Sequence, residues 1–246
     1  MSIRTILLIC LSYLLIACGS KDVDDITAGW SAEELYNSAK GEMIDGNYQT
    51  AIERYEILES RYPFGKYATQ AQLDVGYAYY KYDELDPALS AIDRFIKLNP
   101  RHPAVDYAYY LKGIINFNRG GSILDKIYAR DMAAFDQSIL ISSFNDFQIL
   151  ARRFPDSKYA VDSRQLLIYL RDMLAIADLK IAQFYAARDA WVAAANRTRA
   201  ILQTYPGTSA IKPALEIQLL AYQALGLEQL ATDTQRIINL NYKGGS

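Results

Sequence analysis

The chain of 246 residues contains one histidine and two cysteines, so the side chains that most often build metal sites and disulfide frameworks are scarce. The histidine, His102, lies between Arg101 and Pro103 with no obvious second ligand. The motifs His-Glu-x-x-His and Gly-x-Ser-x-Gly are missing, as is a phosphate loop ending in Gly-Lys-Ser/Thr. We therefore expect no catalytic residue, no metal site and no cofactor.

An excess of positive charge is also lacking. There are 26 lysines and arginines against 28 aspartates and glutamates, which gives a formal net charge of −2 at neutral pH. Proteins that bind nucleic acids in general carry a basic excess. The charge balance therefore argues against a nucleic-acid partner.

The hydrophobic run at the N-terminus is too short to span a bilayer comfortably. Residues 5–17 follow Arg4 and would measure about 20 Å as a helix, whereas a bilayer core is about 30 Å thick. Such a segment is typical of an export signal. Its end, Leu15-Ile16-Ala17-Cys18, resembles the bacterial lipobox; the alternative is an ordinary secretory signal with an incidental cysteine.

The lipobox predicts a signal peptide at residues 1–17, a lipidated Cys18 and a flexible tether over residues 18–30. Residue 19 is glycine, whereas an aspartate there would resemble an inner-membrane retention signal. We therefore expect lipid anchoring to the outer membrane, on its periplasmic face. A triacylated cysteine would make this attachment effectively permanent.

What the sequence does contain is a repeated helix pattern, measured backwards from a proline. Before Pro63 there is an apolar residue at offset 5, an aromatic residue at 8, a small residue at 12, a large apolar residue at 15 and a glycine at 17. These residues are Leu58, Tyr55, Ala51, Tyr48 and Gly46. Three later prolines, Pro100, Pro155 and Pro206, are preceded by related residues at offsets 15, 12, 8 and 5: Leu85, Ala88, Ile92 and Phe95; Leu140, Ser143, Phe147 and Leu150; Trp191, Ala194, Thr198 and Ile201. Spacings of 3, 4 and 3 place each set on one helix face, as in tetratricopeptide (TPR) helix pairs.

Small residues also occur on the first helix of a pair. Ser31 can cap a helix over residues 32–44, in which Ala39 lies 24 residues before Pro63, and Gly76 lies 24 residues before Pro100. We expect small-to-small contacts at the crossings, Ala39 with Ala51 and Gly76 with Ala88.

The proline spacing shows one interruption. Pro100 and Pro155 are 55 residues apart, against 37 for the preceding interval, which predicts an insertion at 118–136. It is either a surface loop or an excursion that contacts a partner. A long helix is predicted over 158–187. Ten helices in five pairs give an all-α, right-handed α-solenoid, with N-terminal TPR repeats at 31–155 and C-terminal repeats at 156–242.

Tyrosine is abundant, with twenty residues. Tyr77, Tyr79, Tyr80 and Tyr82 cannot all lie on one side of a helix, so some of the rings should face the concave side of the solenoid. Tyrosine has a rigid apolar body and a polar tip, which suits extended and varied peptides.

Several segments resemble the BamD family, the lipoproteins of the outer-membrane β-barrel assembly (BAM) machine of Gram-negative bacteria. They are Arg61-Tyr62-Pro63-Phe64-Gly65, Tyr77-Ala78-Tyr79-Tyr80-Lys81, Ala91-Ile92-Asp93-Arg94-Phe95-Ile96, Leu98-Asn99-Pro100, and Ala190-Trp191-Val192-Ala193 with Asn196-Arg197. The resemblance implies a scaffold without catalysis. Its C-terminal repeats would bind a periplasmic POTRA domain of BamA, other faces would bind BamC and BamE, and its N-terminal repeats would bind unfolded outer-membrane proteins as clients.

The resemblance and the repeat pattern together suggest site residues. We expect Arg197 to contact BamA, because it lies in the segment most like the family's C-terminal binding region; a helix-surface salt bridge is the alternative. Tyr62 and Phe64 flank Pro63 in a turn, outside the helix faces that are expected to be buried. They are therefore the candidates for client binding; the alternative is that Phe64 plugs the junction between the first two pairs. A rival function is a TPR lipoprotein that positions or activates cell-wall enzymes, which the repeats alone do not exclude.

Overall fold

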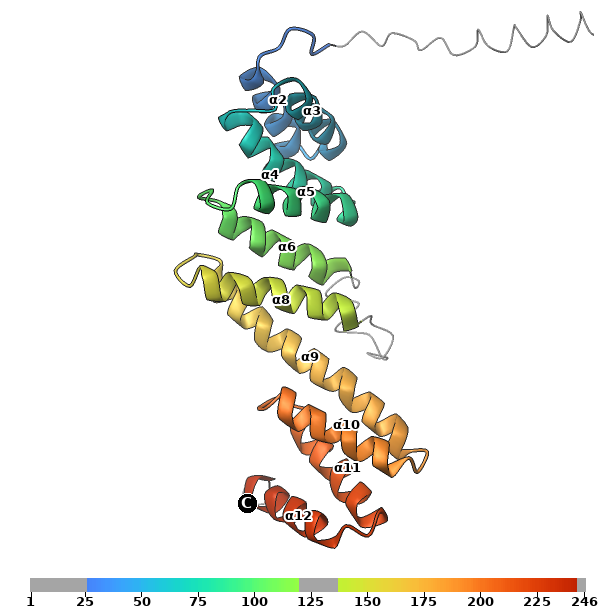
Figure 1. The fold of residues 1–246 in the computed structure, drawn as a ribbon. Coiled ribbons are helices and arrows are strands. Elements are labelled where there is room, and N and C mark those ends of the chain that lie inside the picture. Colours follow the sequence, from blue (N-terminus) through green and yellow to red (C-terminus); the bar gives the residue numbers. More distant parts are fainter. Residues whose placement is uncertain (1–25, 120–136, 243–246) are drawn as a thin grey trace, which may run out of the picture.

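The computed structural model describes residues 26–119 and 137–242, which form ten α-helices and no strand. In chain order they are α2 (Ala32–Ile44), α3 (Tyr48–Arg61), α4 (Lys66–Lys81), α5 (Leu85–Leu98), α6 (Val105–Arg119), α8 (Gln137–Arg153), α9 (Ala160–Ala186), α10 (Trp191–Thr204), α11 (Ile211–Ala224) and α12 (Glu228–Tyr242). The helices stack in order along the molecule (Figure 1), each against the next. The prediction of an all-α solenoid of five helix pairs is confirmed. The signal peptide, Cys18 and nearly all of the predicted insertion lie outside the described residues.

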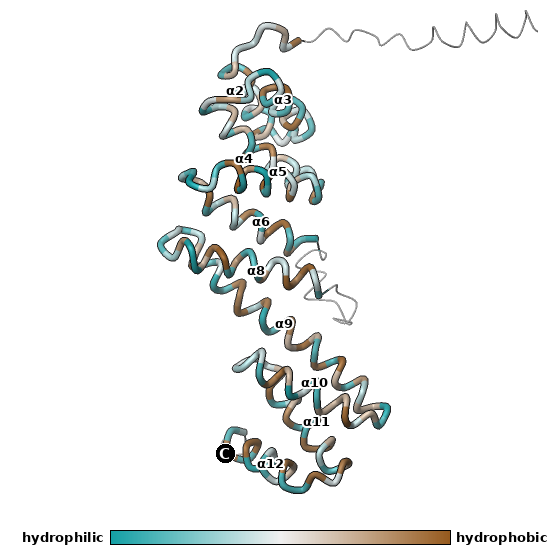
Figure 2. Tube along the Cα trace, viewed as in Figure 1, coloured by the Kyte–Doolittle hydropathy of each residue, from teal (hydrophilic) through white to brown (hydrophobic). Residues whose placement is uncertain are grey.

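The register predicted by the prolines is confirmed by burial. The side chains at the three offsets nearest the prolines are fully buried in all four repeats, whereas the residue at offset 15 is only half-buried in three of them. The small residues at offset 12 are Ala51, Ala88, Ser143 and Ala194. Figure 2 shows apolar and polar residues following one another in short stretches along each helix, as expected for helices that bury one face.

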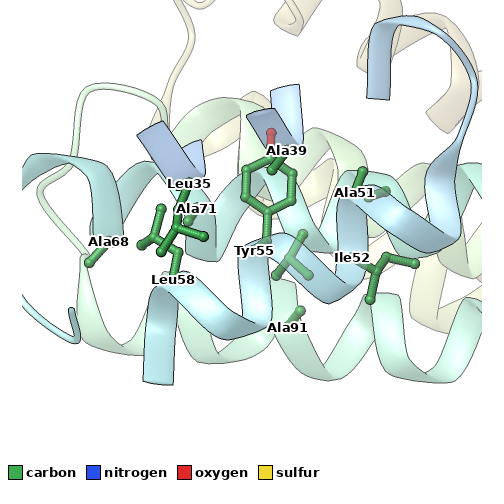
Figure 3. Packing of buried hydrophobic residues seen from close by; sticks show 11 residues of the cluster. Leu35, Ala39, Ala51, Ile52, Tyr55, Leu58, Ala68, Ala71 and Ala91 are labelled. Carbon is green, nitrogen blue, oxygen red and sulfur yellow. The ribbon is translucent and has the colours of Figure 1, made fainter. Parts of the chain in front are cut away.

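The first cluster of the core lies where α2, α3 and α4 meet (Figure 3). Ala39 and Ala51 are both fully buried there, around Tyr55. The nearest neighbours of Gly76 differ from the expected Ala88, because a Cβ on Gly76 would lie 2.6 Å from Ile92 Cδ1 and 3.5 Å from Ala91 Cβ. A small residue on one helix therefore receives a large one from its partner, which fills space better than two small residues would.

The third pair follows the same rule. A Cβ on Gly113 of α6 would lie 2.6 Å from Cε1 of Phe147 on α8. A polar contact adds to this one, because Ser143 Oγ donates a hydrogen bond to the Gly113 carbonyl at 2.9 Å. The glycine thus allows an aromatic ring to pack against the backbone of the neighbouring helix.

A polar network also lies between α5, α6 and α8. Asp146 is 5% exposed and accepts a hydrogen bond from Asn116 Nδ2 at 2.7 Å. Lys112 Nζ lies 3.5 Å from Asp146 and 2.7 Å from Asp93 of α5. Burial raises the pKa of Asp146, and the Lys112 ammonium opposes that shift. The network joins three consecutive helices through polar side chains that would be left without a partner if one of them were removed.

The helix ends follow local chemistry. Ser31 and Glu34 form the capping box that starts α2, with Ser31 N donating to Glu34 Oε2 at 2.8 Å. Gly46, at offset 17 from its proline, has φ of 83° and permits the turn into α3. Asp83 and Asp189 occupy the same offset in two later repeats and have φ of 67° and 56°. Both aspartates therefore adopt a left-handed conformation that glycine adopts at less cost.

We expect Asp83→Gly to raise the free energy of unfolding by about 0.5–1 kcal/mol, because it removes the steric cost of the left-handed backbone. Thermal unfolding followed by circular dichroism would measure the change. Gly46→Ala is the matched control and should lower stability by about 1 kcal/mol, since its Cβ would meet nothing within 4 Å and only the backbone is strained. A lower melting temperature for Asp83→Gly would contradict this explanation.

Candidate partner and client interfaces

The turn between α3 and α4 presents an aromatic residue to solvent. Tyr62 is the C-cap of α3, Pro63 prevents continuation of the helix, and Gly65 has φ of 101° at the start of α4. Phe64 is 90% exposed. The alternative in which Phe64 plugs the junction of the first two pairs is therefore wrong. The ring is free to contact another molecule, and its role in client binding stays a prediction.

Residues that precede α2 are attached to the same turn. Arg61 Nη1 donates to the carbonyl of Thr27 at 2.6 Å, and Arg61 Nη2 donates to its Oγ1 at 3.0 Å. Tyr62 Oη donates to the Trp30 carbonyl at 2.8 Å. The tether, predicted to extend to residue 30, is therefore fixed to the body from Thr27 onward. We call Thr27, Trp30, Arg61 and Tyr62 the tether clamp; the sequence contained no signal for it, because a basic residue in a last helical turn is ordinary.

The tether clamp also changes the interpretation of Tyr62. Its hydroxyl is already satisfied by the chain itself, while its side chain remains 37% exposed. Tyr62 can therefore offer its ring, but not a free hydroxyl, to a client. Phe64 is the more accessible of the two candidates.

Tyrosines on the first helices of the pairs form ring contacts with one another. The rings of Tyr110 and Tyr159 stack with centroids 4.8 Å apart, and Tyr107 lies 5.3 Å from Tyr159. Several hydroxyls are held internally, as when Tyr36 donates to Asp74 Oδ2 at 2.9 Å. Burial raises the pKa of the Tyr36, Tyr107 and Tyr110 hydroxyls above the usual value. These hydroxyls stay protonated, and much of the polar capacity expected for peptide binding is used within the chain.

Arg197 on α10 lies beside α9. Its side chain is 37% exposed, and Nη1 lies 3.3 Å from Oδ1 of Asp178, whose side chain is 13% exposed. The salt bridge weighed as the alternative therefore exists. It uses one guanidinium nitrogen at a long distance, so the rest of the planar fork can still receive a carboxylate. The geometry is compatible with a partner contact and does not by itself require one.

The histidine of the chain, His102, packs inside the fold. His102 Nδ1 accepts a hydrogen bond from the Ala104 amide at 3.2 Å, and its ring meets Phe95 edge-on at a centroid distance of 5.2 Å. Over residues 26–119 and 137–242, no group of three or more histidine, cysteine or acidic side chains is placed to hold a metal ion. Within the same ranges, no helix is both long and apolar enough to cross a bilayer.

The sequence also matches a known protein family and its members. The YfiO family model, described as outer membrane lipoprotein, matches residues 29–237. A relative from Neisseria meningitidis named "Outer membrane protein assembly factor BamD" is 42% identical over 243 residues, which are 97% of this chain and 91% of the relative. A relative of the same name from Vibrio cholerae is 40% identical over 228 residues, 93% of this chain and 94% of its own.

Among solved structures, a crystal structure of the MamA protein covers 87% of this chain and 97% of its own, with 16% sequence identity and a TM-score of 0.37. That likeness is too distant to carry an argument. The family match covers every helix from α2 to α11, and the two relatives align with 97% and 93% of the chain. The chain therefore belongs to the BamD (YfiO) family of outer-membrane lipoproteins.

Proposed function

We propose that this protein is an outer-membrane lipoprotein scaffold of the β-barrel assembly machinery, which binds unfolded outer-membrane proteins and BamA and so promotes insertion. Relatives named as outer-membrane protein assembly factors align with 93–97% of the chain, which supports this role over the positioning of cell-wall enzymes. The protein works without a catalytic step. Its solenoid instead provides several surfaces on one rigid body.

The observation that carries the client role is the turn of Tyr62 and Phe64. A phenylalanine that is 90% exposed has no packing function in the chain itself, and it lies directly beside the tether clamp. Clients whose last strand carries alternating aromatic side chains could stack on it while differing in sequence. The N-terminal repeats, residues 31–155, would be the client side.

The partner side would be the C-terminal repeats, residues 156–242, with Arg197 contacting the POTRA domain of BamA. BamC and BamE would occupy other faces. Cys18 would carry the lipid and hold the body at the periplasmic face of the outer membrane, with residues 1–17 removed and residues 18–30 as the tether.

Affinity purification from detergent-solubilised membranes tests the proposed function as a whole. Recovery of a BamA-type β-barrel protein with the bait supports assembly. Recovery of a murein synthase or hydrolase without any β-barrel protein would instead support the rival scaffold for cell-wall enzymes.

For the client site, we expect a peptide with a client's C-terminal strand and a photo-crosslinker to form adducts at Tyr62 or Phe64. Phe64→Ala should reduce the yield at sub-saturating peptide by more than tenfold, since removal of an aromatic anchor from an interface costs about 2 kcal/mol or more. Because Phe64 is exposed, helicity and melting temperature should not change. Adducts confined to residues beyond 156 would exclude the N-terminal repeats as the client side.

For the partner site, we expect Arg197→Glu to weaken the pull-down of BamA at least tenfold, because loss of one member of a charge pair at an interface costs about 2–5 kcal/mol. Arg199→Glu on the same helix is exposed and serves as the control for charge reversal. Asp178→Asn tests the salt bridge separately. Equal binding by wild type and Arg197→Glu would remove Arg197 from the interface.

A further inference from the structure

The two edges of the solenoid carry opposite charge. One edge is formed by the turns that join one pair to the next; those after α5, α8 and α10 lie along the left of Figure 1. The exposed cations at the turns after α3, α5 and α8 are Lys66, Lys97, Arg101, Arg152, Arg153 and Lys158. We call these six residues the basic edge. Lys212 continues it at the turn after α10.

The opposite edge is formed by the turns within the pairs, of which the turn between α9 and α10 lies at the right of Figure 1. Its exposed carboxylates are Asp45, Asp83, Glu84, Asp86, Asp189 and Glu228. In the described part of this edge the exposed cations are Lys81, Arg188 and Arg119, of which Arg119 is paired with Asp86 at 2.7 Å. Among the described residues, exposed carboxylates therefore outnumber cations at this edge and cations outnumber carboxylates at the other, although the net charge of the chain is only −2.

Internal ion pairing does not explain the basic edge. In the part of the chain that the structure describes, none of its six cations forms a salt bridge. Three of them lie against aromatic rings instead: Lys66 over Tyr67 at 4.7 Å, Lys158 over Tyr159 at 5.0 Å and Arg153 over Tyr109 at 5.4 Å. The exposed carboxylates at this edge are Asp156, Asp162 and, in the first turn of α2, Glu33 and Glu34. Asp106 accepts a hydrogen bond from Ser157.

Helix dipoles do not explain it either. Lys97 and the arginines lie near helix C-termini, where cations are favourable. Lys66 is the first residue of α4, Lys158 precedes α9 by two residues, and Lys212 is the second residue of α11. At these N-termini a cation is unfavourable, so the dipole would select against them. A partner outside the chain can account for the cations near the helix C-termini as well as for those near the N-termini.

Apolar side chains and the tether clamp lie on the same edge. Phe64 and Leu98, which are 90% and 60% exposed, lie beside Lys66 and Lys97 in the sequence. The tether clamp fixes Thr27 to Arg61, the residue that ends α3 at this edge. Basic side chains mixed with exposed apolar ones are the composition of protein surfaces that lie in the interfacial region of anionic membranes.

We propose that the basic edge is a membrane-docking surface, which binds anionic lipid headgroups of the bilayer and turns this edge of the solenoid toward it. Leu98 enters the interfacial region while the six cations lie over the phosphates, and Phe64, at the end of this edge, stays with the client site. The acidic edge then faces away. The orientation rests on the proposed lipid anchor at Cys18, whereas the affinity for lipid does not, so the two can fail separately.

The orientation is measured on the lipidated protein in vesicles that contain phosphatidylglycerol. Cys10 leaves with the signal and Cys18 is acylated, so a fluorophore on Leu98→Cys or on Asp45→Cys would be the only label. Nitroxide-labelled headgroups should quench the Leu98→Cys fluorophore, and should leave the one at Asp45→Cys nearly unquenched. Equal quenching, or the reverse order, would overturn the proposal. So would an unquenched Leu98 position, the result expected if the basic edge receives an acidic protein segment instead.

The affinity is measured without the acyl chains, on the full mature chain carrying Cys18→Ser and vesicles with and without phosphatidylglycerol. Each cation near an anionic surface strengthens binding by a factor of about five. Reversing four of them, with Lys97→Glu, Arg101→Glu, Arg152→Glu and Lys158→Glu, should weaken vesicle binding by about a hundredfold or more. High salt should do the same to the unreversed chain.

The matched control reverses four exposed cations elsewhere: Lys81→Glu, Arg188→Glu, Arg199→Glu and Arg236→Glu. It makes the same change in net charge and should keep most of the vesicle binding. Circular-dichroism melts show whether both variants remain folded. An equal loss in both sets would mean that net charge and not the edge matters, and absence of binding by the unreversed chain would likewise overturn the proposal.

Discussion

Phe147→Ala should lower the free energy of unfolding by about 3–5 kcal/mol, because it empties a fully buried site between α6 and α8. The ring fills the space that Gly113 leaves on α6, where a Cβ would lie 2.6 Å from Cε1. The neighbouring helix backbones limit how far this site can collapse. Denaturant unfolding followed by circular dichroism would measure the change.

Phe64→Ala is the matched control, since it removes the same side chain from a site that is 90% exposed. It should change stability by less than about 0.5 kcal/mol. Gly113→Ala tests the same contact from the opposite side and should destabilise by overpacking. Combined with Phe147→Leu, which removes the clashing Cε1 and Cζ atoms of the ring, its cost should fall below the sum of the two single changes. Simple additivity would mean that glycine and ring do not share this space.

Cys18→Ser should release the protein from the membrane fraction almost completely. Each buried CH₂ of an acyl chain contributes about 0.8 kcal/mol, so removing three chains outweighs any contact that the folded body makes. Cell fractionation followed by a high-salt wash would measure the loss. The wash also removes the electrostatic part of the docking proposed for the basic edge.

Cys10→Ser is the matched control, because Cys10 lies in the segment that is cleaved off and its loss should leave membrane attachment unchanged. If the Cys18→Ser chain stayed with the membranes after the wash, a lipid on Cys18 would not be the anchor. Partial release that becomes complete in high salt would assign the remainder to partner proteins and to the basic edge.

The candidate sites could be read from the sequence only in part. Cys18 is a candidate because the lipobox is a local motif, and Phe64 is a candidate because it lies in a turn, outside the buried helix faces. The contact of Arg61 with Thr27 could not be predicted, because 34 residues separate the two and neither belongs to a pattern. The salt bridge of Arg197 with Asp178 was likewise foreseen only as a possibility, since its partner depends on how α9 and α10 cross.

The helix register, by contrast, was determined by the sequence alone. Proline and the spacing of apolar residues act within a single helix, so offsets from Pro63 and its counterparts were enough to identify the buried faces. Only the tertiary structure decided which residues meet across helices. Gly76 receives Ile92 rather than Ala88, and Lys112 joins Asp93 to Asp146, because crossing angle and side-chain volume select contacts that no one-dimensional pattern contains. The separation of charge between the two edges is of the same kind, since it appears only once turns some 35–55 residues apart are stacked side by side.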